Sequence, residues 1–377
     1  MNITFWSDSL IPSTTANSIQ VMKMCDAFTE LGNNIVLHAK KNNFTDINME
    51  SDIASIYGVK SDFKLLRHRS LGVIKHLDYD LAILNNILRS KPDLIYTRSL
   101  RGAFWGNLLN KRTILELHYL PVTRANRWML KRLSDKHNLI KIITISETLK
   151  KMLLENHPNL NAIPIQVCHD AIDIDRFPET PNNPSEMKLK LKIDPGRKIV
   201  MYVGHLYKGR GIDLIEQLAQ IQPDLEFVLI GGLPKDVHYR RTKAIQLGLN
   251  NLRYLGFIPN SKLNKYYQIA DALIMPYERK VSVSGGGDTS GWMSPLKTFE
   301  YMASGKPLIS SDLPSLRETL NADNSVLVEP GNLEQWKYSI EYTLTNIPFA
   351  NKISRNARRQ AEQNTWLTRA ENILRQI

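Results

Sequence analysis

The sequence predicts an α/β protein made of two doubly wound units. Short apolar runs rich in β-branched residues alternate with amphipathic helical segments along most of the chain, a pattern typical of parallel sheets covered by helices on both faces. A length of 377 residues suits two domains or one large one. A polar, proline-containing stretch at 170–195 interrupts the alternation, and we interpret it as the linker between two units.

The half before the linker predicts one sheet and its helices. The helical segment 18–31 places Ile19, Met22, Cys25 and Phe28 on one side and ends at Gly32. A second helix is expected at 147–154. The expected strands are 3–7, 34–39, 93–97, 113–118, 141–146 and 164–168.

The half after the linker predicts a second unit of similar size. Its expected strands are 198–204, 226–231, 252–255, 272–275 and 308–311, and its expected helices are 212–220, 238–247, 261–270 and 295–304. A last helix contains Trp366 and Arg369. Because ligands of doubly wound sheets bind beyond the carboxyl ends of the strands, a cleft between two such units would receive one substrate from each side.

Composition narrows the class of protein. The apolar fraction of 42% and the charged fraction of 23% are ordinary for a soluble globular protein. No apolar run approaches the ~20 residues of a transmembrane helix. The first residues enter a strand pattern without a basic leader or cleavage site, so we expect no signal peptide. Cys25 and Cys168 are expected to be reduced core residues, which fits the cytoplasm.

The formal net charge of +12 indicates an anionic partner. We expect no nucleic acid, because the chain contains neither an interleaved basic and aromatic RNA motif nor a DNA-reading module. A diphosphate ligand or an anionic membrane surface fits better. No cluster of cysteines and histidines has the spacing of a metal site.

Basic residues gather between positions 124 and 141. Pro121 could start a helix there, with Leu130 and Leu133 turned inward and Trp128 or Met129 near the surface. Such a helix could dock on anionic lipid, and the alternative is a solvated basic helix face. The basic residues, which have only Asp135 against them, are Arg124, Arg127, Lys131, Arg132, Lys136 and Lys141.

The segment 294–307 predicts a helix built to hold an anion. Ser294 suits the N-cap and Pro295 the first helical position, while Gly305 can end the helix in the left-handed conformation. Lys297 lies in the first turn, where free backbone N–H groups favour an anion, and Glu300 follows one turn later on the same side. The carboxylate could accept hydrogen bonds from ribose hydroxyls. On spacing alone, a surface ion pair between the two residues is an open alternative.

A glycine-containing turn follows the expected strand 198–204. It carries Lys208 and Arg210 between Gly204 and Gly211, at the start of a helix, which suits a diphosphate. The spacing from Gly204 to Gly209 is that of a P-loop, but Arg210 and Gly211 replace the required Lys and Ser or Thr, so we reject an NTPase. Solvent-facing cations on a turn are the alternative.

Other strand ends carry candidate polar contacts. His118 ends the expected strand 113–118 and would lie at the rim of a cleft, unless it is a structural histidine bonded to backbone. Asn17 and Ser18, in the first loop, are small and polar enough for a substrate to approach closely, although they could equally serve as a simple helix cap. Arg98 follows the strand 93–97 and is a candidate contact for an acceptor.

The run S-P-L-K-T-F-E-Y-M-A-S-G-K-P-L-I-S-S-D, residues 294–312, resembles the donor-binding motif of family 4 of the retaining glycosyltransferases, which have the GT-B fold. The resemblance extends over nearly the whole chain. It implies two Rossmann-like domains facing a central cleft, with an acceptor domain at 1–177 and a nucleotide-sugar donor domain at 178–354. A C-terminal helix at about 355–377 would cross back to the first domain.

The resemblance also implies roles for individual residues. Glu300 would bind the nucleotide ribose, and the helix start would face the phosphates and sugar of the donor. His118 matches a histidine near the donor sugar, and Arg210 with Gly211 matches a Lys-Gly pair. The expected catalytic residues are then His118, Arg210 and Lys297, the expected donor-binding residues are Gly204, Lys208, Ser294, Pro295, Leu296 and Glu300, and the expected acceptor contacts are Asn17, Ser18 and Arg98.

The chain departs from the family pattern in three places. A second Glu is usual eight positions before Glu300, where this chain has Trp292. The contact to the donor sugar therefore passes to the backbone around 292–294 or to Asp288. His205 stands where many members have Arg, and the first loop lacks the Gly-Gly of many GT-B enzymes. The glycine run before Asp288 is expected to become ordered when donor binds.

The expected reaction is retaining transfer of a hexosyl unit from a UDP- or GDP-sugar to a saccharide or lipid-linked acceptor, in the synthesis of surface polysaccharide, lipopolysaccharide or capsule. We expect no cofactor and no metal, because no set of metal ligands is evident in the sequence. The D-x-D sequence at 173–175 resembles the interdomain hinge of the family. The expected location is the cytoplasm, at the inner face of the membrane. The alternatives are an idle nucleotide-sugar-binding subunit, or an epimerase or hydrolase with the same fold.

Overall fold

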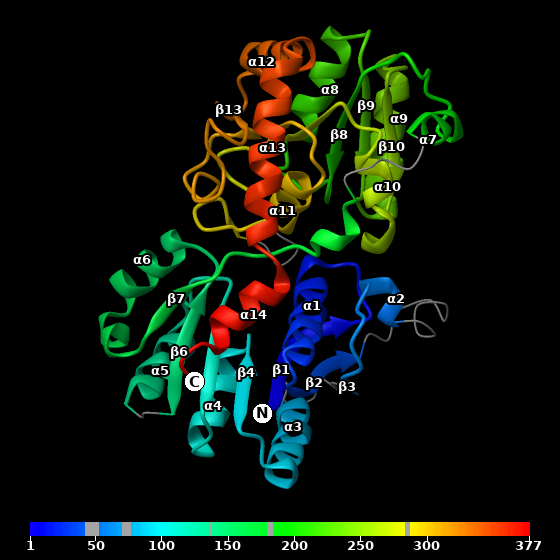
Figure 1. Cartoon of the computed structure of the whole chain (residues 1–377). Coiled ribbons are helices and arrows are strands. Elements are labelled where there is room, and N and C mark those ends of the chain that lie inside the picture. Colours follow the sequence, from blue (N-terminus) through cyan, green and yellow to red (C-terminus); the bar gives the residue numbers. More distant parts are fainter. Residues whose placement is uncertain (42–52, 70–76, 136–137, 179–183, 283–286) are drawn as a thin grey trace. The chain divides into compact units, whose positions relative to one another are not determined.

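The chain folds into two compact units, each built on one parallel sheet (Figure 1). The computed structural model describes residues 1–41, 53–69, 77–135, 138–178, 184–282 and 287–377. Unit 1 comprises Met1–Asp170 and Trp366–Ile377, and unit 2 comprises Ala171–Thr365. The unit boundary thus lies at 170/171, whereas the sequence suggested 177/178, and the returning segment is shorter than the expected 355–377.

Unit 1 contains a seven-stranded sheet in the order β3-β2-β1-β4-β5-β6-β7, in which every strand pairs in parallel with its neighbours. Its strands are β1 (Asn2–Ile11), β2 (Asn34–Lys41), β3 (Lys64–His68), β4 (Leu94–Thr97), β5 (Thr113–Leu117), β6 (Leu139–Thr144) and β7 (Ile165–Val167). Its helices are α1 (Ala16–Glu30), α2 (Ile53–Tyr57), α3 (Leu77–Ser90), α4 (Leu100–Leu108), α5 (Arg124–Ser134), α6 (Glu147–Asn156), the 3-10 helix η2 (Pro158–Ala162) and α14 (Trp366–Leu374).

Unit 2 contains a six-stranded parallel sheet in the order β10-β9-β8-β11-β12-β13. Its strands are β8 (Ile199–Val203), β9 (Glu226–Ile230), β10 (Leu252–Gly256), β11 (Ala272–Met275), β12 (Leu308–Ser311) and β13 (Val326–Val328). Its helices are α7 (Pro184–Lys190), α8 (Ile212–Ile221), α9 (Pro234–Gln246), α10 (Asn264–Tyr267), α11 (Leu296–Ala303), α12 (Leu333–Thr345) and α13 (Ile347–Gln363), with 3-10 helices η3 (Ile174–Arg176) and η4 (Asn260–Lys262).

Helices cover both faces of the unit 2 sheet because successive side chains of each strand point to opposite sides. In β8, Met201 packs in one core with residues of α11 and α13, such as Phe299. Its neighbour Tyr202 packs in the opposite core with residues of α8, α9 and α12, such as Trp336. The two parallel sheets and their helices confirm the predicted α/β class with two Rossmann-like units.

Three local expectations are met. Both cysteines are free and buried, Cys25 in α1 and Cys168 just after β7. In α5, Leu130 and Leu133 are fully buried while Trp128 is 52% exposed. Gly305, which follows α11, has a φ of +68°, the left-handed conformation that the sequence predicted.

Several expected element bounds are wrong. Helix α5 begins at Arg124 behind the N-cap Thr123, so Pro121 lies outside it. Lys141 belongs to β6, and its ammonium donates to the backbone of Ile373 and Arg375, so it is not part of a basic helix face. Lys136 lies outside the described residues, as do parts of the expected linker and of the glycine run before Asp288.

Candidate active site

In unit 2 the turn after β8 brings the chain against two neighbouring segments. A Cβ placed on Gly204 would lie 2.3 Å from Lys297 Nζ. Gly209 and Gly211 have positive φ values and lie so close to the backbone of Lys280 and Pro276 that a Cβ would overlap it. These glycines are therefore required for the close approach of the turn to α11 and to the segment after β11.

The Nζ atom of Lys297 is buried and has no hydrogen-bonding partner among the described residues. Among the described residues nothing lies within bonding distance of its shielded Nζ, which sits 4.1 Å from the ring centroid of Tyr202 and 5.1 Å from that of Tyr277. Burial, followed by repulsion from Arg210, holds the pKa of Lys297 well below its usual value. The open alternative of a surface ion pair with Glu300 is therefore not realised.

Arg210 approaches the same pair of rings from the turn. Its guanidinium donates to the Tyr277 hydroxyl at 2.8 Å and lies 4.9 Å from the centre of that ring. A weaker bond of 3.4 Å reaches the carbonyl of Ser282, while Arg210 Nε has no partner among the described residues. The structure thus brings Arg210 and Lys297 together around Tyr277, with tyrosines rather than carboxylates beside them.

Helix α11 starts one residue later than predicted. Pro295 is the residue preceding the helix and Leu296 is the first helical residue, so Ser294 is not the N-cap and no side chain caps this end. The amide of Thr298 donates to the carbonyl of Pro295 at 2.9 Å. A helix end without a side-chain cap keeps N–H groups available, because the first turn has no internal partners for them.

Glu300 lies one turn into α11 and is 9% exposed. Its Oε1 accepts a hydrogen bond of 2.5 Å from Asn260 Nδ2, and its Oε2 accepts one of 2.8 Å from the Tyr267 hydroxyl. The carboxylate is therefore oriented by two neutral donors.

Three further residues of the expected donor region are Lys208, His205 and Asp288. The side chain of Lys208 is exposed. The ring of His205 stacks on Tyr207 at 4.6 Å, and burial lowers the pKa of this histidine. Asp288 Oδ1 accepts from the amides of Val281 and Ser290, both at 2.9 Å, so this carboxylate closes a local turn.

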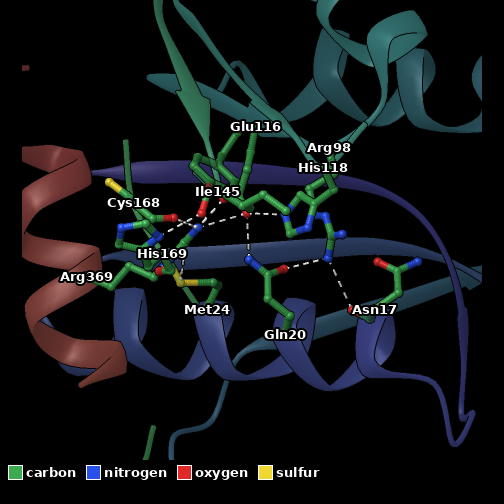
Figure 2. A network of polar contacts seen from close by, with 11 residues as sticks. Asn17, Gln20, Met24, Arg98, Glu116, His118, Ile145, Cys168, His169 and Arg369 are labelled. Carbon is green, nitrogen blue, oxygen red and sulfur yellow. Dashed lines mark hydrogen bonds and ion pairs between the residues drawn. The ribbon is translucent and has the colours of Figure 1, made fainter. Parts of the chain in front are cut away.

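In unit 1 the end of β5 carries a buried carboxylate next to the expected histidine (Figure 2). Glu116 is fully buried, and His118 Nε2 lies 2.5 Å from its Oε1. Burial lowers the pKa of His118 to about 4, with a further lowering by Arg98, so its imidazole is neutral at pH 7. A neutral ring that donates from Nε2 to a carboxylate has its lone pair on Nδ1.

Arg369 of α14 compensates the Glu116 charge. Its NH1 and NH2 donate to Oε2 and Oε1 at 3.2 and 3.0 Å. Burial alone would raise the pKa of Glu116, but Arg369 and His118 lower it to about 2. Gln20 of α1 donates to the same carboxylate at 2.7 Å, and the Tyr96 hydroxyl donates to its other oxygen.

Arg98 continues this network toward α1. Its NH1 donates to Gln20 Oε1 at 2.6 Å and to the carbonyl of Asn17 at 3.3 Å (Figure 2). Burial lowers the pKa of Arg98 to about 10 and raises that of nearby Asp170 to about 7. The structure therefore places Asn17, Arg98 and His118 along one chain of contacts.

Ser18 does not join that chain of contacts. It is buried, and its hydroxyl, which has one hydrogen to donate, lies 3.0 and 2.9 Å from the carbonyl oxygens of Ser13 and Thr15. Thr15 caps α1 by accepting from the Ser18 amide. The N-cap is therefore Thr15, and Asn17 and Ser18 lie in the first turn of α1 rather than at its cap.

The sequence interpretation missed the residues that hold the expected ones. Glu116 could have been found, because residues two apart in a strand share a face and a charge inside the run 113–117 is unusual. Arg369, Asn260, Tyr202 and Tyr277 gave no local signal, since each acts on a residue far away in the sequence.

Two features are absent from the part of the chain that the structure describes. No group of three or more His, Cys, Asp or Glu side chains is arranged to hold a metal ion within the described ranges. None of the described helices combines the length and apolarity needed to cross a membrane.

Comparisons with known proteins point to one kind of chemistry. The family described as "Glycosyl transferases group 1" matches residues 185–360, which lie in unit 2. "Putative glycosyltransferase YtcC" of Bacillus subtilis (strain 168) is 23% identical over 79% of this chain and 75% of its own length. "D-inositol 3-phosphate glycosyltransferase" of Corynebacterium aurimucosum is 27% identical over 67% of this chain and 60% of its own. The protein is a glycosyltransferase.

A solved structure shows the fold of this glycosyltransferase. Anabaena Alr3699/HepE in complex with UDP-glucose superposes on this chain with a TM-score of 0.73. The complex of the same protein with UDP gives 0.74. The match covers 99% of this chain and 98% of the other at 16% identity. The transferase thus has the GT-B type of architecture, with two Rossmann-like units, that its sequence predicted.

Proposed function

We propose that this glycosyltransferase is a retaining enzyme that moves a hexosyl unit from a UDP- or GDP-sugar to a saccharide or lipid-linked acceptor. The observation that carries the proposal is the buried Lys297 ammonium, which has no hydrogen-bonding partner among the described residues. A buried cation is costly unless an anion meets it. The diphosphate of a nucleotide sugar is such an anion, and the similar HepE was solved with UDP-glucose.

Lys297 and Arg210 have the placement needed to stabilise the leaving group. A nucleoside diphosphate gains negative charge as the glycosidic bond breaks, and fixed cations that meet this charge lower the barrier. Arg210 Nε is also without a partner among the described residues, and the uncapped start of α11 adds backbone N–H groups. In this proposal the two side chains and the helix start do the work without a metal or other cofactor.

The other donor contacts follow from the resemblance to family 4. Glu300 accepts hydrogen bonds from the ribose, and Gly204 and Lys208 line the phosphate side. Ser294, Pro295 and Leu296 contribute backbone where Trp292 stands in place of the usual second Glu. We infer retention through a same-face route, in which the departing phosphate helps to deprotonate the acceptor hydroxyl. His118 makes a polar contact to the reacting sugar or the acceptor, and Arg98 and Asn17 contact the acceptor.

The acceptor and location are proposed from charge. Helix α5 presents Arg124, Arg127 and Lys131 near the exposed Trp128. A basic helix with an exposed tryptophan suits an anionic membrane surface. We therefore propose a cytoplasmic enzyme at the inner face of the membrane, acting in surface polysaccharide, lipopolysaccharide or capsule synthesis. Free buried cysteines fit a reducing compartment.

The test begins with binding and then asks for turnover. UDP- and GDP-sugars are screened by thermal shift, because a bound donor raises the apparent stability. The stabilising donor is then incubated with and without a saccharide or lipid-linked acceptor, and the anomeric configuration of any product is read by NMR. Release of sugar without an acceptor would indicate a hydrolase, and a changed donor would indicate an epimerase. Binding without any turnover would indicate an idle subunit.

A further inference from the structure

The carboxylate of Glu300 is held from two sides by neutral donors. Asn260 of η4 donates to Oε1 at 2.5 Å, and Tyr267 of α10 donates to Oε2 at 2.8 Å. Both donors belong to the segment that follows β10, so a single stretch of chain orients both oxygens. Side-chain motion of the carboxylate would break one of these two bonds.

Arg176 determines which way the Asn260 amide faces. Its guanidinium donates to the Asn260 side-chain oxygen and to the Asn260 carbonyl. Because the amide oxygen is engaged by Arg176, the amide nitrogen must point the other way, toward Glu300. Arg176 is itself held, since Asn264 Nδ2 donates to its carbonyl at 2.9 Å.

Tyr267 is fixed by packing. Its side chain is 1% exposed, and its ring lies 5.9 Å from that of Phe177 and 5.7 Å from that of Tyr301. Burial, followed by the charge of Glu300, holds its pKa well above the usual value, so the phenol keeps the proton that it donates. Packing therefore fixes the position of the Tyr267 hydroxyl, which donates its proton to Glu300 Oε2.

This geometry leaves each carboxylate oxygen with room for one more donor. A carboxylate offers about four acceptor sites, and Asn260 and Tyr267 take one on each oxygen. Two neighbouring hydroxyls, such as those of a ribose, match the two remaining sites. We propose that Asn260 and Tyr267 are positioning residues that aim Glu300 at both ribose hydroxyls and so set the preference for ribonucleotides, with Arg176 fixing Asn260. This rests on the donor site of the proposed function.

The test compares ribose with deoxyribose. Dissociation constants for UDP and GDP identify the nucleotide that the unmodified protein binds, and its 2′-deoxy and 3′-deoxy forms are then measured by titration calorimetry. A hydrogen bond to a charged group contributes ~1.5–3 kcal/mol, so each deoxy form should bind the unmodified protein roughly 10- to 150-fold more weakly. In Tyr267→Phe and Asn260→Ala this ratio should fall at least about fivefold, and in Glu300→Ala it should approach 1.

Tyr301→Phe is the matched control. It also removes a buried tyrosine hydroxyl in the same core, but that hydroxyl bonds to the backbone of Val203 and not to Glu300. Its ribose-to-deoxyribose ratio should stay at the unmodified value. Near-UV circular dichroism checks the folding of each variant. Asn260 is only partly buried, so Asn260→Ala carries the test if Tyr267→Phe does not fold.

The outcomes separate the inference from the proposed function. If the unmodified protein binds neither UDP nor GDP, the donor site is wrong, and the inference fails with it. If it binds one of them and discriminates against the deoxy forms, but the folded variants keep the same ratio, Asn260 and Tyr267 have only a structural role. A nucleotide that binds equally well with and without its hydroxyls would remove the assigned role of Glu300. A lowered ratio in both variants, with Tyr301→Phe unchanged, supports the proposal.

Discussion

Arg369 in α14 donates two hydrogen bonds to the carboxylate of Glu116 in strand β5. Its NH1 lies 3.2 Å from Oε2 and its NH2 lies 3.0 Å from Oε1. Both side chains are almost completely buried, with exposures of 3% and 0%. The pair joins residues 253 positions apart, so it connects the C-terminal helix α14 to strand β5, which His118 directly follows. Loss of either partner leaves the other as an uncompensated charge.

Arg369→Met is therefore expected to lower the free energy of unfolding by ~3–5 kcal/mol, the cost of breaking a buried ion pair from one side. The double variant Arg369→Met with Glu116→Gln should recover part of this loss, because it leaves no buried charge. Urea denaturation followed by fluorescence measures both. Arg317→Met is the control, since Arg317 pairs with Asp312 on the surface and should change the midpoint little. An unfolding midpoint of Arg369→Met equal to that of the unmodified protein would contradict this account.

Acid should weaken unit 1 through the same carboxylate. The pKa of Glu116 is about 2 in the folded state, below its ordinary value of 4.5. A lowered folded pKa contributes stability that is present above pH 4.5 and is lost as the pH falls toward 2. Denaturation curves between pH 6 and 2 should show a steeper loss for the unmodified protein than for Glu116→Gln. Parallel curves for the two proteins would count against the lowered pKa.

His118 should stay neutral throughout the physiological range. Its pKa of about 4 lies below the ordinary 6.5, so its stabilising contribution is complete above pH 6.5 and is lost as the pH falls toward 4. A ¹⁵N NMR titration of labelled imidazoles, assigned with His118→Gln, should give one histidine with this low pKa and with its proton on Nε2. A His118 signal that titrates near 6.5 would show that burial and Arg98 do not lower its pKa as described.

The sequence predicted the core of the fold because buried parallel strands are continuous apolar runs. The bounds of β11 and β12 agree with the predicted ranges 272–275 and 308–311. The strand β3 was missed, since its residues Lys64–His68 are mixed in polarity and lie at the sheet edge, where burial is only partial. Helix α13 begins at Ile347, before the predicted start at about 355. Its buried residues Ile353, Ala357 and Ala361 stand at helical spacing, so the sequence did contain a pattern that indicates this helix.

The candidate site was predictable only where its residues form a local pattern. Lys297 and Glu300 stand three residues apart in one predicted helix, and Arg210 stands in a glycine turn, so each was recognisable in the sequence. Their supports were not recognisable, because the contacts of Arg210 and Lys297 with Tyr277 depend on how β8, β11 and α11 pack together. A sequence pattern gives the reactive groups, whereas tertiary packing decides their partners and their protonation.

Binding of a diphosphate should be coupled to proton uptake by Lys297. Burial, then Arg210, lowers the pKa of Lys297 in the free protein, and a bound diphosphate would raise it. The complex then carries more protons than the free protein, so affinity should fall as the pH rises between the two pKa values. Titration calorimetry with UDP or GDP in buffers of different ionisation enthalpy measures the uptake. Lys297→Met should abolish it, and an equal uptake in that variant would assign the proton to another group.

Gly204→Ala should weaken donor binding far more than it weakens the fold. The added Cβ would lie 2.3 Å from Lys297 Nζ and 2.9 Å from the Tyr202 hydroxyl, so the ammonium must move from its place between the rings. Gly331→Ala is the matched control, because Gly331 also has a positive φ but no atom within 4 Å of its Cβ position. Both variants should lose roughly 1–2 kcal/mol of stability, because a residue with a Cβ is strained at a positive φ.

Donor affinity distinguishes the two glycine variants. Displacing one phosphate-binding cation should cost roughly 10-fold or more in the dissociation constant of UDP or GDP for Gly204→Ala, given that hydrogen bonds to charged groups contribute ~1.5–3 kcal/mol. Gly331→Ala should bind with the unmodified constant. If Gly204→Ala bound the nucleotide as tightly as Gly331→Ala does, Lys297 would have no part in holding the diphosphate. Because Gly204 has no side chain of its own to lose, a change in affinity beyond that of Gly331→Ala reports on the Cβ that the variant adds at this position.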